Sequence, residues 1–143
     1  MTTMAPSERT NTGIGDDQRV ELPLGLLGFE RIKKYEVVGM PEEAPFLWLQ
    51  MAEDPKHAFL VVPPAVVLTD YRPDLSEEDV RFLGIENPAD AWVLNIVTLR
   101  HNGSSTVNLK GPVVFNRRTR VGKQVIPLNA ASFPLQHPLG VVA

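Results

Sequence analysis

Proline and glycine divide this 143-residue chain into short segments, and this division limits its fold more than any other feature. Thirteen prolines and ten glycines separate the apolar runs. The longest apolar stretch, 58–68, itself contains Pro63 and Pro64. Because a membrane-spanning helix needs about 20 apolar residues, no span is predicted. The pattern argues against a helical bundle and favours short strands joined by tight turns.

Apolar or alternating runs predict the strands of a mainly antiparallel, all-β protein. The expected strands are 20–22, 35–38, 46–51, 58–62, 66–69, 92–99, 106–110, 113–115 and 124–128. Asn102-Gly103 predicts a two-residue hairpin turn, and Gly111-Pro112 predicts a bulge or a barrel corner. We therefore expect a small closed or nearly closed β-barrel with one short helix near 76–83.

The helix has clear boundary signals. Ser76 is a suitable N-cap, Asp79 can complete a capping box, and Gly84 stands where a glycine often ends a helix. The acids of its first turn, Glu77 and Glu78 among them, are favoured there by the helix dipole. This acidic cluster therefore has a structural explanation as well as a functional one. Asn95, inside an apolar run, should be buried and should brace a neighbouring loop by hydrogen bonding.

Charge is distributed unevenly along the chain, whose net charge is -3. All 17 acidic residues lie at or before Asp90, together with eight of the 14 basic ones. Residues 1–90 therefore carry a net charge of -9, and residues 91–143, which have six basic residues and no acid, carry +6. This indicates an acidic face that meets a basic partner, or simply hairpins of different charge. The negative total argues against nucleic acid as a direct ligand.

No pattern of catalytic or metal-binding residues is present. The chain has no cysteine, which excludes disulfides, thiol catalysis and cysteine-based metal sites. His57, His101 and His137 lie in separate turns without metal-ligand spacing. Gly122-Lys123 lacks the other residues of a phosphate-binding loop. We therefore expect that the protein is not an enzyme and that it binds no metal and no cofactor.

The N-terminal residues differ in composition from the rest of the chain. Residues 1–18 are polar, contain no secretory signal, and are expected to form a disordered tail, so the location should be cytoplasmic. Residues 19–143 should form a single domain.

The segment 117–123 holds four cations, Arg117, Arg118, Arg120 and Lys123, and suggests an alternative function as an RNA-binding β-barrel. The sequence does not indicate an oligomeric state.

Four stretches match the motifs of one known family. They are 24–30 (LGLLGFE), 46–50 (FLWLQ) with 54–59 (DPKHAF), 106–116 (TVNLKGPVVFN) with 122–124 (GKQ), and 136–139 (QHPL). Together they resemble the FliW family of flagellar assembly factors over about residues 19–139. Gly111 stands where alanine is more familiar, Phe115 stands where isoleucine is, and the N-terminal tail looks like an addition.

The resemblance implies a non-enzymatic bacterial regulator with a small β-barrel fold. FliW proteins bind the basic translational repressor CsrA, and this binding prevents CsrA from repressing flagellin mRNA. They also bind flagellin. From charge and chemistry we expect two binding patches. Residues for the CsrA-like partner are Asp70, Tyr71, Asp74, Glu77 and Glu78. Residues for flagellin are Asn108, Lys110, Pro112 and Asn116, although the two asparagines have an alternative role in tying a barrel corner together.

Overall fold

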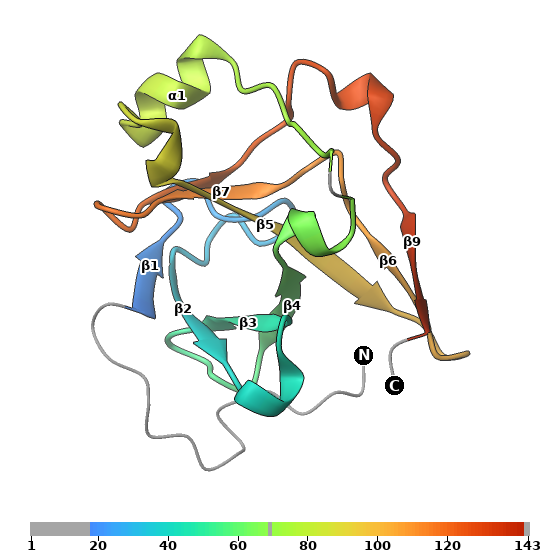
Figure 1. Ribbon diagram of the computed structural model, residues 1–143. Helices are drawn as coiled ribbons and strands as arrows, with labels where there is room; N and C mark the ends of the chain where they lie inside the picture. Colours follow the sequence, from blue (N-terminus) through green and yellow to red (C-terminus); the bar gives the residue numbers. More distant parts are fainter. Residues whose placement is uncertain (1–17, 69, 142–143) are drawn as a thin grey trace.

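The computed structural model describes residues 18–68 and 70–141 (Figure 1). Of the expected tail, residues 1–17 lie outside the described residues. Within the described part, the strands are β1 (Arg19–Glu21), β2 (Lys34–Gly39), β3 (Leu47–Met51), β4 (Ala58–Val62), β5 (Ala91–Leu99), β6 (Ser104–Val107), β7 (Val113–Asn116), β8 (Gly122–Gln124) and β9 (His137–Val141). The helices are α1 (Glu77–Leu83) and the short 3-10 helices η3 (Pro41–Glu43), η4 (Pro64–Val66), η5 (Pro88–Asp90) and η6 (Ala130–Ser132).

Strand β5 organises the sheet. The strands run in the order β1-β2-β3-β4-β5-β6-β9, while β7 pairs with β5 and β8 pairs with β7. The first half of β5 (91–94) pairs with β7, its last three residues pair with β6, and Asn95 and Ile96 pair with β4. All these strand pairs are antiparallel. In Figure 1, β5 crosses the molecule, with β1–β4 below it and β6 and β9 at one side.

The barrel is nearly closed between β1 and β8. No continuous ladder joins these two strands within the described residues. Instead, β1 contacts the residues just before β8, through an isolated parallel bridge between Glu21 and Val121 and a hydrogen bond of 2.9 Å from the Glu21 N–H to the Arg120 carbonyl oxygen. The mainly antiparallel β fold, small and barrel-like with one α-helix, is confirmed.

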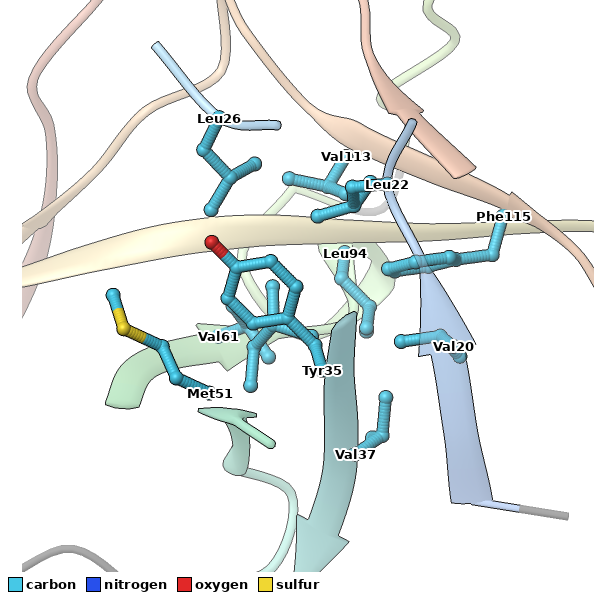
Figure 2. Packing of buried hydrophobic residues seen from close by; sticks show 11 residues of the cluster. Val20, Leu22, Leu26, Tyr35, Val37, Met51, Val61, Leu94, Val113 and Phe115 are labelled. Atoms are coloured by element: carbon cyan, nitrogen blue, oxygen red, sulfur yellow. The ribbon is translucent and has the colours of Figure 1, made fainter. Parts of the chain in front are cut away.

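Alternate residues of the strands fill two cores on opposite faces of the sheet. Val37, Leu49 and Val61 point into the barrel, whereas their neighbours Val38 and Trp48 point into the second core. Figure 2 shows the barrel core, which consists of Val20, Leu22, Leu26, Tyr35, Val37, Leu49, Met51, Val61, Leu94, Val113 and Phe115. The second core packs the outer face of the sheet against Val67, Leu68 and Tyr71 and against Phe133 and Leu139.

Helix α1 forms where its boundary signals predict it. The Ser76 hydroxyl accepts a hydrogen bond of 3.0 Å from the Asp79 N–H, and Gly84 adopts the left-handed conformation (φ +66°) that ends the helix. Leu83 of the helix packs against Val114 of β7 and against Val125, which directly follows β8. The Asp79 side chain forms an ion pair with Lys123 of β8. This pair fixes the first turn of α1 on the sheet.

The hairpin between β5 and β6 differs from the prediction by one residue. The Arg100 N–H donates to the Ser104 carbonyl oxygen at 2.9 Å, so three residues form the loop rather than two. Gly103, the last of them, has φ +83°. A glycine in the left-handed region is what a three-residue hairpin loop requires at this position.

Two strand predictions were wrong and one strand was not expected, and a proline lies at each of the three places. Of the strand expected at 66–69, Val66 is the last residue of η4, which begins at Pro64, and residues 67 and 68 belong to no strand. Residue 69 lies outside the described residues. The closing strand was expected at 124–128 but ends at Gln124. Pro127 follows, and the Leu128 N–H donates to the Asp74 carbonyl oxygen. Strand β9 was not expected, since Pro138 lies within it, but at the edge of a sheet a proline is tolerated.

Candidate functional site

An open groove of about 310 Å³ lies where four segments of the chain meet. It is lined by Leu24, Gly25, Leu26, Leu27, Glu30, Asn108, Lys110, Gly111, Lys123, Gln124, Ile126 and Leu135. Three of the stretches that carry the family resemblance, 24–30, 106–116 and 122–124, therefore converge on this groove.

Gln124 joins two walls of the groove. Its side-chain carbonyl oxygen accepts a hydrogen bond of 2.9 Å from the Leu27 N–H. Its amide nitrogen donates to the Gly111 carbonyl oxygen at 3.1 Å. A Cβ added at Gly111 would lie 3.2 Å from that amide nitrogen, so a glycine permits the close approach. The Gln124 amide therefore fixes the 24–30 loop relative to the corner between β6 and β7.

Asn108 holds that corner together. Its side-chain oxygen accepts hydrogen bonds of 3.0 Å from the N–H groups of both Lys110 and Gly111. Its own carbonyl oxygen accepts a bond of 2.9 Å from the Asn95 side chain, which confirms that Asn95 is buried and braces a loop. Asn108 is half-buried and still lines the groove. It therefore has the structural role considered from the sequence, and it also faces the site.

Exposed aliphatic side chains surround the groove. Leu27 is 83% exposed, Ile126 is 68% exposed, and Leu24 and Leu135 are more than half exposed. Sequence reasoning missed all four as site residues: Ile126 lay in an expected strand, and the other three lay outside every expected strand and helix. The available signal was the presence of large apolar residues in loops rich in glycine and proline. Contiguous exposed apolar surface of this kind is typical of a protein-binding site.

The other two residues predicted to bind flagellin are buried. Pro112 lies at the corner, and Asn116 has no exposed surface. The Asn116 amide nitrogen donates to the carbonyl oxygens of Leu83 and Gly84, and its side-chain oxygen accepts from the N–H groups of Arg118 and Thr119. Its polar atoms are thus committed to joining α1 to the β7–β8 turn. In this structure Asn116 can support a binding surface but cannot contact a partner.

Four of the five residues predicted to bind a basic partner are exposed. Asp70 and Asp74 precede α1, and Glu77 and Glu78 lie in its first turn. We call these four residues the acidic surface. Asn129 fixes the segment before the helix, since its side chain accepts from the Asp74 N–H and donates to the Arg72 carbonyl oxygen, both at 2.9 Å.

Tyr71, the fifth residue, is buried in the second core. Its hydroxyl donates to the Leu109 carbonyl oxygen at 2.7 Å, and its ring packs edge-on against Phe133. Burial raises the pKa of this hydroxyl above its ordinary value. Tyr71 therefore anchors the backbone beside the acidic surface and has little side-chain area to offer a partner.

The groove and the acidic surface are connected through Lys123. This residue lines the groove, and its Nζ lies 2.5 Å from Asp79 Oδ1 in the first turn of α1. The same Nζ lies 5.4 Å from the centre of the Phe82 ring, which is partly exposed on the helix. The ion pair therefore links a residue of the groove to the helix turn that carries Glu77 and Glu78.

The basic 117–123 loop is largely engaged with its neighbours. Arg118 pairs with Asp90 at 3.0 Å and lies 3.8 Å from Glu86, and the Arg117 guanidinium lies 5.3 Å from the centre of the Trp92 ring. With Lys123 paired to Asp79, two of the four cations already have counter-charges. This arrangement gives the RNA-binding alternative less support than the sequence did.

Other chemistry is sparse in the part of the chain that the structure describes. Residues 18–68 and 70–141 contain no group of three or more His, Cys, Asp or Glu side chains that could hold a metal ion. His57 forms a contact of 2.8 Å with Asp54 in an exposed turn. None of the helices in these ranges has the length and hydropathy needed to cross a bilayer.

Known proteins resemble the chain over nearly all of its length. The family model described as FliW protein matches residues 4–139, which begins further toward the N-terminus than the motifs do. The flagellar assembly factor FliW of Bacillus licheniformis is 38% identical over 130 residues, covering 90% of each chain. That of Leptospira interrogans serovar copenhageni is 36% identical over 118 residues, covering 81% of this chain and 79% of the relative.

The fold agrees with these sequence matches. The crystal structure of a flagellar assembly factor FliW superimposes with a TM-score of 0.81 and 28% sequence identity, covering 95% of both chains. The sequence motifs, the family model and the nearly closed barrel lead to one conclusion. This chain belongs to the FliW family of flagellar assembly factors.

Proposed function

We propose that this flagellar assembly factor couples flagellin synthesis to flagellin level by binding two proteins in the cytoplasm. One is a basic RNA-binding repressor of the CsrA type, whose repression of flagellin mRNA it relieves. The other is flagellin, which occupies the factor and so returns the repressor to the mRNA. In this proposal the chain catalyses no reaction and acts through its surfaces alone.

The observation that carries the proposal is the groove. Three stretches that resemble the family motifs converge there, and the groove lining exposes Leu24, Leu27, Ile126 and Leu135 to solvent. Exposing this much aliphatic surface is unfavourable in a monomer, and burying it against a partner recovers about 25 cal/mol per Å² of apolar area. Flagellin is the partner we assign to the groove, because amphipathic helices of its terminal regions can place an apolar face there.

The acidic surface supports the second interaction. Asp70, Asp74, Glu77 and Glu78 are exposed on one helix end and the segment before it. Carboxylates in this arrangement attract a basic partner and repel the RNA backbone that competes for it. Because exposed charges act through solvent, the interaction should weaken as salt is added.

The groove assignment is tested by placing a charge on its rim. Leu27→Asp and Ile126→Asp should each weaken flagellin binding at least about tenfold, since a carboxylate would be buried against an apolar helix face. Val66→Asp is the matched control, because Val66 is an exposed aliphatic residue outside the groove. Isothermal titration with purified flagellin measures all three. Equal affinities for the groove variants and the control would contradict the assignment.

The acidic surface is tested by charge reversal. Asp74→Lys with Glu78→Lys should weaken binding to a CsrA-type dimer about tenfold or more at low salt, and should flatten the salt dependence. Glu42→Lys with Glu53→Lys changes the net charge equally at two exposed positions away from α1 and serves as the control. If both double variants lose the same affinity, only the overall charge matters and the acidic surface is not the site.

A further inference from the structure

We infer that Lys110 determines which helix enters the groove, by pairing with a carboxylate that borders the apolar face of that helix. The inference rests on the proposed function and names the chemistry of the segment that the groove accepts. That segment is an amphipathic helix with aliphatic side chains on one face and an acidic residue beside them.

A helix fits the groove better than an extended peptide does. Four N–H groups of the groove wall are already used: that of Gly25 donates to the Leu22 carbonyl oxygen, that of Leu27 to Gln124, and those of Lys110 and Gly111 to Asn108. A peptide that binds as an added strand needs free backbone donors and acceptors on its partner. A helix satisfies its own backbone and needs only the side-chain surface that the groove offers.

The two lysines that line the groove differ in their charge balance. Lys123 is paired with Asp79 at 2.5 Å. Lys110 donates to a neutral acceptor, the Ala130 carbonyl oxygen, at 2.9 Å, and within residues 18–68 and 70–141 it has no ion pair. It is half-buried, and it lines the groove together with five aliphatic residues, Leu24, Leu26, Leu27, Ile126 and Leu135. A partly desolvated ammonium without a counter-charge favours a carboxylate that arrives with a ligand.

Glu30, the third charged residue that lines the groove, orients the carboxylate of the incoming helix. Glu30 lines the same space, and its carboxylate accepts a hydrogen bond of 2.9 Å from the Gly28 N–H, which lowers its pKa. Glu30 therefore stays ionised at neutral pH and repels an acidic residue of the ligand. With an anion held on the 24–30 loop and a cation on the corner at Lys110, the groove distinguishes acidic from basic borders of an incoming helix.

The test uses purified flagellin as the probe and isothermal titration as the measurement. Lys110→Arg keeps the charge and a donor toward Ala130, and should bind within about threefold of the parent chain. Lys110→Met should bind about tenfold more weakly and with less salt dependence, and Lys110→Glu still more weakly. Lys56→Glu is the control, because Lys56 is exposed in the turn between β3 and β4. Urea unfolding of each variant separates lost binding from lost folding.

A second arm identifies the paired residue. Acidic residues of the flagellin terminal helices are changed one at a time to lysine, and one of these changes should restore binding to the Lys110→Glu chain. Unchanged affinity of Lys110→Met and Lys110→Glu, while Leu27→Asp still weakens binding, would overturn the inference and leave the proposed function standing. If the parent chain does not bind flagellin at all, both are overturned.

Discussion

The Tyr35 hydroxyl is an unusual group in the barrel core. Tyr35 is 1% exposed, and within the described residues its hydroxyl has no hydrogen-bond partner. Figure 2 shows the oxygen directed toward Leu26 among aliphatic side chains. A buried polar atom without a partner costs about 1–3 kcal/mol. We therefore expect Tyr35→Phe to be at least as stable as the parent chain in urea unfolding at pH 8. A loss of stability would reveal a partner for the hydroxyl, such as a buried water.

The same residue makes the stability of the protein depend on pH in the alkaline range. Burial raises the pKa of Tyr35 from 10.0 to about 12. Above pH 10 the unfolded chain releases this proton while the folded chain retains it, so stability falls as pH rises from 10 toward 12. By pH 11.5 the parent chain should lose about 2 kcal/mol that Tyr35→Phe does not lose. Parallel unfolding curves for both proteins at pH 8 and pH 11.5 measure the difference, and equal losses would contradict it.

Asn116 shows how one amide can stabilise two elements. It contacts the last carbonyl oxygens of α1 and the backbone of the β7–β8 turn, and it is fully buried. Removing it leaves several buried backbone groups without partners. Asn116→Ala should therefore lower the free energy of unfolding by about 2–4 kcal/mol. Flagellin binding measured well below the unfolding midpoint should stay within about twofold of the parent chain, as expected of a supporting residue. A large loss of affinity with intact stability would assign it direct contact.

At the scale of elements, Gln124 connects the 24–30 loop to the corner between β6 and β7. Gln124→Ala removes the acceptor for the Leu27 N–H and the donor to Gly111. The Leu27 amide should then exchange with solvent about tenfold faster, since this hydrogen bond restricts local opening. Hydrogen exchange followed by NMR measures it, with the amide of Leu60 in β4 as an internal reference that should not change. Equal rates at Leu27 would show that packing alone holds the loop.

Elements whose signals are local could be predicted from the sequence. Helix α1 formed as expected because Ser76 and Gly84 act on backbone groups a few residues away. Strand β9 could not be predicted, because its pairing with β6 is non-local and Pro138 argues against a strand until its edge position is known. The pairing of β5 with three different strands could not be predicted either. Hydrophobic alternation shows which face of the sheet a residue occupies, but it does not show which strand lies beside it.

At the scale of the molecule, the candidate site was predicted in part. The exposure of Asp74, Glu77 and Glu78 follows from charge, because carboxylates are rarely buried without a partner. The groove could not be predicted, since Leu27, Ile126 and Leu135 come from distant segments and form one surface only after folding. For the same reason, the sequence could not show that Asn116 is fully buried while Asn108 is only half-buried.

The two cores of the domain share β5, and this sharing determines how the molecule unfolds. Leu94 lies in the barrel core and Val97 in the second core, three residues apart on one strand. Neither core can lose β5 without disrupting the other, so we expect a single cooperative transition. The chain carries a reporter in each region, since Trp48 is buried in the second core and Trp92 packs against the barrel core.

Single-tryptophan variants test this cooperativity. In Trp92→Phe and in Trp48→Phe, the fluorescence of the remaining tryptophan and the far-UV circular dichroism should share one urea midpoint. Adding Leu94→Ala, which should cost about 2–5 kcal/mol by opening a cavity in the barrel core, should lower the midpoint seen by Trp48 as much as that seen by Trp92. If the urea midpoint reported by Trp48 stayed unchanged while the midpoint reported by Trp92 fell, the second core would fold without the barrel. Such a result would mean that β5 does not couple the two cores.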